Sequence, residues 1–128
     1  MKKLFLLSIL FFSFSLFSQN SEKITTKKCI PKKGLHLKLK SVFNDSRCPQ
    51  GVECIWAGEV SAIVEIYKDK KLVEEKTLTF NSKNREKNNK WFENYFSKKI
   101  KIVSVMPIRK DDEQIDLKKY FINVVFTD

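Results

Sequence analysis

Apolar residues alternate with polar ones along most of the chain after residue 20, and this alternation constrains the fold more than any other feature. The clearest runs lie at residues 35–39, 60–67, 72–80, 100–102 and 120–126. A period of two places every second side chain on the same face of a β-strand, so each run has one apolar face. Polar segments such as the turn-like residues 68–71 separate the runs. The pattern predicts an all-β fold, either a single antiparallel β-sandwich or a small barrel.

Helical spacing is much weaker. After residue 20 we find no apolar spacing of three and four residues that continues for longer than two turns. Residues 81–90 are rich in Asn and Lys, and we expect them to form a loop. Residues 111–119 are expected to form one helical turn before the last strand.

The first residues have the three-part layout of a secretory signal peptide. Lys2 and Lys3 precede an apolar run at residues 4–17, and a polar stretch follows at residues 18–21. The run is shorter than the about 18 residues that a spanning helix needs, so we expect an exported protein that does not span the membrane. A buried N-terminal helix is the alternative.

This layout divides the chain into a signal peptide at residues 1–19, a basic N-terminal segment at residues 20–34 and one β-sandwich domain at residues 35–128. We expect the mature protein to be periplasmic or secreted. Its compartment therefore permits disulfide bonds.

The charge of the chain is strongly basic, with 25 Lys and Arg against 15 Asp and Glu and a formal net charge of +10 at pH 7. The basic residues gather in residues 20–43 and 81–101. An exported location and the lack of a nucleic-acid-binding motif argue against nucleic acid as the partner. The charge instead favours weak association with anionic envelope polymers or lipid headgroups.

Two of the three cysteines form the densest local motif. Cys48 and Cys54 have five residues between them, including a Pro and a Gly, and this suits a tight loop closed by a disulfide. Closing about seven residues would stabilise the fold by roughly 2.4 kcal/mol. A zinc site usually has a shorter spacing and needs two further ligands, and a redox pair favours C-x-x-C. Cys29 is interpreted either as an unpaired thiol or as an alternative partner of Cys48 or Cys54.

The same stretch carries a resemblance to a known group of proteins. DSRCP at residues 45–49, CIWAG at residues 54–58 and the strand after them resemble a pattern in small exported bacterial proteins and lipoproteins of unknown function. Residues 102–107 and the segment from Ile115 to Tyr120 are also similar to that group. The resemblance covers most of residues 35–126 and implies a β-rich fold and a Cys48–Cys54 disulfide, but no activity. Unlike the lipoproteins, this chain has no cysteine directly after its apolar run.

Two interpretations of the motif are open. In the structural interpretation, which we favour, Asp45 bonds turn amides, Arg47 pairs with a carboxylate and Trp56 packs on the disulfide as a core plug. In the other interpretation, the loop is a rigid contact surface for a partner, formed by the same three residues.

We expect no catalytic residue, no metal and no cofactor. A Cys29–His36 nucleophile would lack a third, orienting group, and His36 is interpreted as a solvent-facing strand residue. The acidic residues at 111–116 are interpreted as a solvated turn rather than a calcium site. The sequence predicts a non-enzymatic exported domain that binds or supports an envelope or extracellular partner. A small inhibitor of exported proteases is the alternative function.

Overall fold

The computed structural model describes residues 20–27, 29–111 and 113–127, and its strands form two antiparallel sheets. One sheet has the order β1-β6-β5 and the other has the order β2-β3-β4. The strands are β1 (Ser21–Thr25), β2 (Leu35–Phe43), β3 (Val60–Lys68), β4 (Lys71–Phe80), β5 (Ile100–Met106) and β6 (Phe121–Phe126). The predicted all-β class is confirmed, and the described strands form two separate sheets rather than a closed barrel. The expected signal peptide lies outside the described residues.

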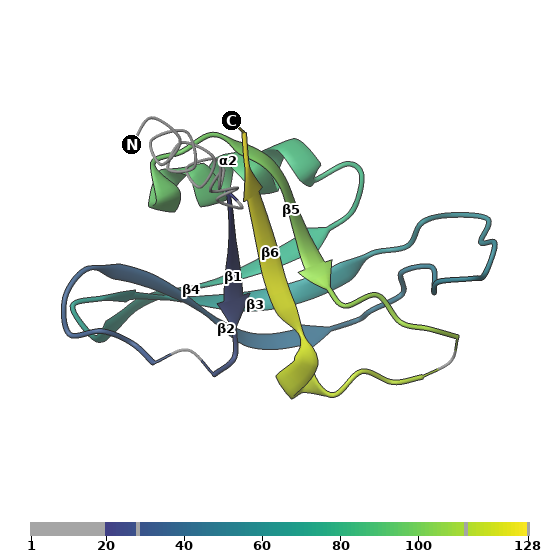
Figure 1. Ribbon diagram of the computed structural model, residues 1–128, viewed down its shortest axis with the longest axis horizontal. Coiled ribbons are helices and arrows are strands. Elements are labelled where there is room, and N and C mark those ends of the chain that lie inside the picture. Colours follow the sequence, from purple (N-terminus) through teal and green to yellow (C-terminus); the bar gives the residue numbers. More distant parts are fainter. Residues whose placement is uncertain (1–19, 28, 112, 128) are drawn as a thin grey trace, which may run out of the picture.

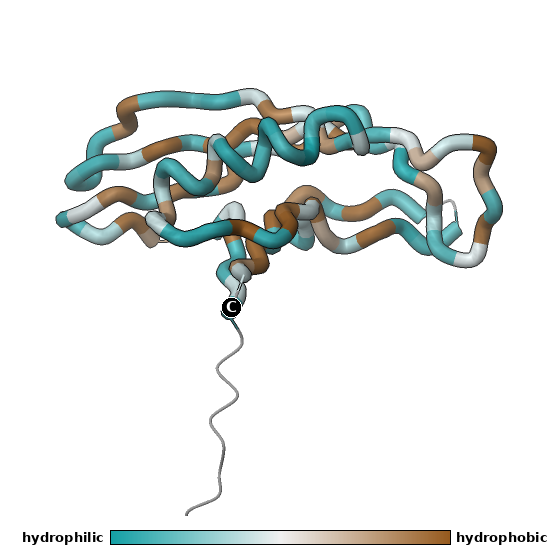
Figure 2. Tube along the Cα trace, turned by 90° about the horizontal axis from the view of Figure 1, so that it is seen from above, coloured by the Kyte–Doolittle hydropathy of each residue, from teal (hydrophilic) through white to brown (hydrophobic). Residues whose placement is uncertain are grey.

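The two sheets pack face to face, and their strands cross at a steep angle (Figure 1). The core lies between them, because the apolar face of each alternating strand points inward. In β2, Leu37 and Leu39 are buried as the alternation predicts, and in β3 the inward positions include Val64 and Ile66. Figure 2 shows this alternation of hydrophobic and hydrophilic residues along the strands.

Strand β1 lies in the basic segment at residues 20–34, where the alternation pattern did not single out a strand. It pairs with β6, and Ile24 lies opposite Ile122 in the register. Both side chains are buried. A five-residue strand with one buried apolar residue has no alternation that can be recognised in the sequence. Its pairing partner, Ile122, is almost 100 residues away, so nothing local indicates the pairing. The segment therefore contributes an edge strand to the sandwich.

The loop predicted for residues 81–90 is wrong, because most of that segment belongs to the helix α2 (Arg85–Phe96). The side chains that the helix turns towards the protein have helical spacing and are Asn88, Trp91, Phe92, Tyr95 and Phe96. Asn88 conceals this pattern in the sequence, since a polar residue fills the first inward position. Its side-chain amide donates a 2.9 Å hydrogen bond to Thr79 O of β4, which explains why a polar residue is tolerated there.

The short helical turn predicted before the last strand is confirmed by the 3-10 helix η1 (Leu117–Lys119). Asp116 begins this turn, and its Oδ1 accepts a 3.1 Å hydrogen bond from the Lys118 N–H. Within the described part of the chain, no helix is both long enough and apolar enough to cross a membrane.

Candidate functional site

The connection between β2 and β3, residues 44–59, extends beyond the end of both sheets (Figure 1). We call it the stapled loop, because a disulfide joins Cys48 to Cys54 within it, with a Cα–Cα distance of 5.9 Å. The predicted disulfide is therefore confirmed. Cys29, the third cysteine, is a free and exposed thiol, so the alternative pairings of Cys29 are wrong.

Hydrogen bonds hold the base of the stapled loop in one conformation. The Ser46 N–H donates to Glu59 O at 2.8 Å, and the Gln50 N–H donates to Arg109 O at 2.8 Å on the neighbouring loop. Gly58 allows the two arms of the stapled loop to approach closely. A Cβ at this position would lie 2.0 Å from Ser46 O, and the φ angle of +71° also favours glycine. The loop is thus rigid because of both its covalent and its backbone contacts.

Asp45 and Arg47 form an ion pair at the start of the stapled loop. The Nε and Nη2 atoms of Arg47 donate to Oδ1 and Oδ2 of Asp45, each at 2.9 Å. Oδ2 also accepts a 2.8 Å hydrogen bond from the hydroxyl of Tyr120. Such a two-pronged contact between a guanidinium and a carboxylate fixes the orientation of both side chains. The expected pairing of Arg47 with a carboxylate is present, and the expected Asp45 contact to a turn amide is the 3.3 Å bond from the Arg47 N–H.

The remaining donors of Arg47 bind the other sheet. Nη1 donates to Val105 O at the end of β5, and Nη2 donates to Pro107 O at 3.1 Å. Arg47 therefore connects the stapled loop to the C-terminal end of β5. Because the guanidinium is used up by these acceptors and by Asp45, it positions the loop and is not free to bind a substrate.

The environment of this network changes the pKa values of its members. Burial alone would raise the pKa of Asp45, but the hydrogen bonds from Arg47 and Tyr120 and the positive charge of Arg47 outweigh it and lower the pKa. Burial, the hydrogen bond to Asp45 and its negative charge raise the pKa of Tyr120 to about 12. At neutral pH the network therefore holds a charged carboxylate and a neutral phenol.

The tip of the stapled loop is apolar and exposed. Ile55 is 105% exposed and Trp56 is 70% exposed, and Val52 beside them is also exposed. The expectation that Trp56 packs on the disulfide as a core plug is wrong. The stapled loop extends beyond the sheets, so its tip does not reach the core and the indole ring stays exposed.

His36 and the described residues of the acidic turn at 111–116 do not lie beside Asp45 and Arg47. His36 is half-buried and lines a separate hollow of about 320 Å³ with Glu22 and Tyr95 among its neighbours. Within residues 20–27, 29–111 and 113–127, no cluster of three or more His, Cys, Asp or Glu is arranged to hold a metal ion. Asp112, part of the acidic turn, lies outside the described residues.

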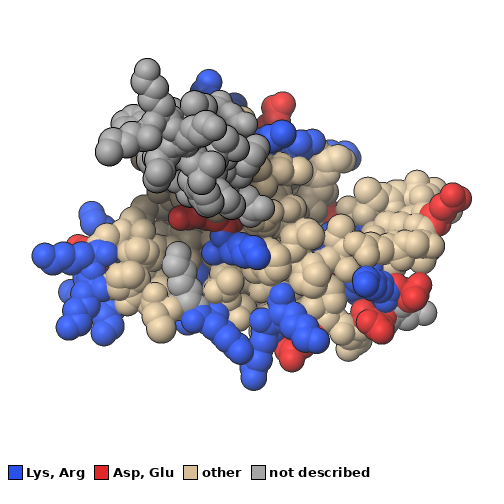
Figure 3. Space-filling view, viewed as in Figure 1, with Lys and Arg blue, Asp and Glu red and all other residues tan. Residues whose placement is uncertain are grey.

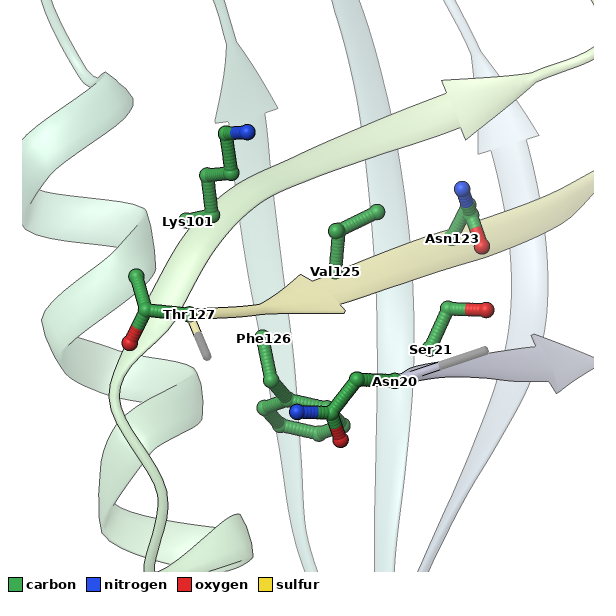
Figure 4. A pocket seen from close by; sticks show the side chains of 7 residues that line it. All are labelled: Asn20, Ser21, Lys101, Asn123, Val125, Phe126 and Thr127. Carbon is green, nitrogen blue, oxygen red and sulfur yellow. The ribbon is translucent and has the colours of Figure 1, made fainter. Parts of the chain in front are cut away.

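Another hollow, of about 500 Å³, is an open depression beside β6 and β1. Figure 4 shows its lining side chains, with Asn123 and Val125 projecting from one side of β6 and Phe126 from the other. Among the described residues that line it, Lys101 is the one with a charged side chain.

Two smaller hollows adjoin the stapled loop. One, of about 240 Å³, lies between residues 56–59 and 81–83, and we call it the Trp56 hollow. The other, of about 310 Å³, runs along β5, and we call it the β5 groove. They share Asn81 and Ser82, so the exposed loop tip and the β5 groove belong to one continuous end of the molecule.

Comparison with known proteins found no matching family model, curated protein or solved structure.

Ile55 and Tyr120 are the members of the site that the sequence did not indicate. Ile55 lies inside the CIWAG motif at residues 54–58, where large apolar side chains such as Trp56 are expected to be buried rather than exposed. Tyr120 lies between η1 and β6, 75 residues from Asp45, and nothing local to it signals a carboxylate partner. A hydrogen bond between such distant residues becomes visible only when both sheets are assembled.

Proposed function

We propose that the protein is an exported, non-enzymatic domain that presents the tip of the stapled loop to an envelope or extracellular protein. The observation that carries this proposal is the exposure of Ile55 and Trp56 on a loop held by a disulfide and by hydrogen bonds at its base. Binding hot spots are typically large side chains of this kind, above all Trp, that become fully buried on contact.

The energetics of such a contact favour a rigid loop. Full burial of one large apolar side chain contributes about 1.5 to 3 kcal/mol. A flexible loop would lose part of this gain because its conformations become restricted on binding. The disulfide and the bonds from Ser46 and Gln50 restrict the loop before any partner arrives, so more of the gain remains as affinity.

The charge distribution supports an apolar contact rather than general electrostatic attraction. Residues 48–58 contain one charged residue, Glu53, in a chain with a formal net charge of +10. In Figure 3, the stapled loop itself is mostly tan with a red group at its tip, whereas Lys and Arg gather at the opposite end and along the lower edge of the molecule. Association of the lysines with anionic polymers is a separate prediction, and it should weaken as salt is added.

Export is the second part of the proposal. It is supported by the layout of residues 1–19 and by the Cys48–Cys54 disulfide, since such bonds persist in oxidising compartments. Mass spectrometry under non-reducing conditions, on protein recovered from the producing cells, tests it. We expect a chain that begins near residue 20 and contains this disulfide. An intact Met1 with both thiols reduced would contradict export.

Site-specific photo-crosslinking tests the contact surface. A photoreactive amino acid is placed at Ile55 in the producing cells, and at Val73 of β4, which is also exposed, as the matched control. We expect a discrete crosslinked protein from position 55 and none from position 73. The crosslink should disappear when Cys48 and Cys54 are both replaced by Ala. Crosslinks at neither position, or equally at both, would contradict the proposal.

A second candidate function, inhibition of exported proteases, is favoured by one specific observation. The stapled loop is convex, rigid and carries the fully exposed Ile55, and such a loop can enter an active-site cleft without rearranging. The purified protein and its Ile55→Asp variant are assayed against a panel of secreted proteases. Inhibition at micromolar protein that the variant loses would support this function, and no inhibition would exclude it.

A further inference from the structure

The β5 groove follows the open edge of a sheet. Residues 102–106 of β5 all line it. Consecutive side chains of a strand point to opposite faces, so five residues in a row can line one groove only along the edge of the strand. β5 is the last strand of its sheet on this side. The end of β4 and the start of α2 form the opposite wall of the groove with Phe80, Asn81, Ser82, Arg85 and Asn88.

The backbone of Val103 points into this groove. In β6, the Phe126 N–H donates a 2.9 Å hydrogen bond to Asn20 O, next to β1. Backbone groups alternate in direction along a strand, so the odd-numbered residues of β6 turn theirs towards β5. Asn123 therefore exchanges hydrogen bonds with Ser104, its partner in the register. The N–H and C=O of the adjacent Val103 consequently point away from β6.

Arg47 supports this direction and marks one end of the free edge. Its Nη1 donates to the carbonyl of Val105, which points the same way as that of Val103 because the two residues are two positions apart in the strand. Within the described chain, the Val103 N–H and C=O have no hydrogen-bond partner. One residue of β5 is therefore available to pair with an added strand.

The groove combines an apolar floor with a positive rim. The apolar lining includes Phe80, Met106 and Ile108, and none of the described residues that line the groove is acidic. Arg47 is neutralised by Asp45, whereas Arg85 is exposed and forms no ion pair within the described residues. The local charge is thus complementary to an acidic ligand.

We propose that the β5 groove binds an extended, acidic segment of a partner protein. The segment pairs with the N–H and C=O of Val103 as an added β-strand, which is a common way for sheets to bind peptides. One apolar side chain of the segment lies on the groove floor, and a carboxylate binds Arg85. This proposal rests on other residues than the loop tip, so either proposal can fail without the other.

Peptide titration followed by NMR tests the groove directly. The purified, isotope-labelled protein is titrated to millimolar concentration with a short acetylated peptide of alternating Glu and Val. The control peptide has Lys in place of Glu. We expect the acidic peptide to shift the Val103 amide signal and to slow its hydrogen exchange, and we expect the Lys peptide to do neither.

A pair of variants separates the rim charge from general electrostatics. Arg85→Glu reverses the charge at the groove, and Lys87→Glu makes the same charge change on the same helix at a residue that does not line it. Both residues are exposed, so both variants should fold. We expect Arg85→Glu to weaken binding about tenfold and Lys87→Glu to change it less than about twofold.

Several results would overturn the proposal. In the titration, these are a Val103 signal that does not shift at millimolar peptide, an equal response to the Lys peptide, or signal shifts confined to residues 52–56. In the variant pair, it is an equal effect of Arg85→Glu and Lys87→Glu on binding. If Val103 shifts instead as the protein dimerises on its own, the occupant is a second copy of the chain, and the proposed partner is wrong.

Discussion

The hydroxyl of Tyr120 donates a 2.8 Å hydrogen bond to Asp45 Oδ2, so the residue just before β6 holds a residue at the base of the stapled loop. Arg47 binds the same carboxylate and reaches the carbonyl of Val105 in β5. These contacts connect the loop to the sheet that does not contain β2 or β3. The position of the exposed tip relative to the sandwich therefore depends on side chains as well as on the disulfide.

Removing the charge of Asp45 should destabilise the protein strongly. The side chains of Arg47 and Asp45 are 16% and 11% exposed, so Asp45→Asn leaves a largely buried guanidinium without its counter-ion. We expect the free energy of unfolding, measured by urea denaturation, to fall by about 3 kcal/mol. Glu53→Gln, at an exposed carboxylate, is the control and should change it by less than about 0.5 kcal/mol. Equal effects would show that the network does not stabilise the fold.

Tyr120 should make the protein sensitive to alkaline pH. Its pKa is raised to about 12 in the folded state from an ordinary value of 10.0, so the folded chain retains a proton that the unfolded chain loses. The stability from this group is complete below pH 10.0 and is lost as the pH rises towards 12. We expect Tyr120→Phe to flatten the decline of unfolding free energy over this range, measured by denaturation at stepped pH. An unchanged slope would contradict the assignment.

Two glycines of the stapled loop allow steric crowding to be separated from backbone strain. Gly51 and Gly58 have φ angles of +79° and +71°, but a Cβ at Gly51 meets nothing within 4 Å, whereas at Gly58 it would lie 2.0 Å from Ser46 O. Gly51→Ala should cost about 1 kcal/mol through its φ angle. Gly58→Ala should cost about 2 kcal/mol more, because the loop arms must move apart. Thermal denaturation of both variants measures the difference, and similar losses would refute the close approach.

The helix α2 should depend on Phe92 for its attachment to the sandwich. This side chain is fully buried, and Phe92→Ala should lower the free energy of unfolding by about 4 kcal/mol. Lys90→Ala, at an exposed position of the same helix, should change it by less than about 0.5 kcal/mol. A small loss for Phe92→Ala, measured by urea denaturation, would mean that the helix is not part of the cooperative core.

Local patterns determined several features of this protein. Leu37 and Leu39 alternate with polar residues, and β2 buries both, because the period of a strand depends only on neighbouring residues. The spacing of Cys48 and Cys54 likewise permits a disulfide without any distant contact. The same reasoning failed for α2, since Asn88 occupies an inward position and is tolerated there through its bond to Thr79.

The tertiary structure decided the rest. Ile24 of β1 is buried only because β6 places Ile122 opposite it. Trp56 is exposed only because the stapled loop extends past the sheets. Burial and pairing depend on which distant segments come together, and no local period contains that information. Alternation and cysteine spacing thus determined the fold class and the disulfide, whereas the assembled sheets decided which side chains are left for a partner.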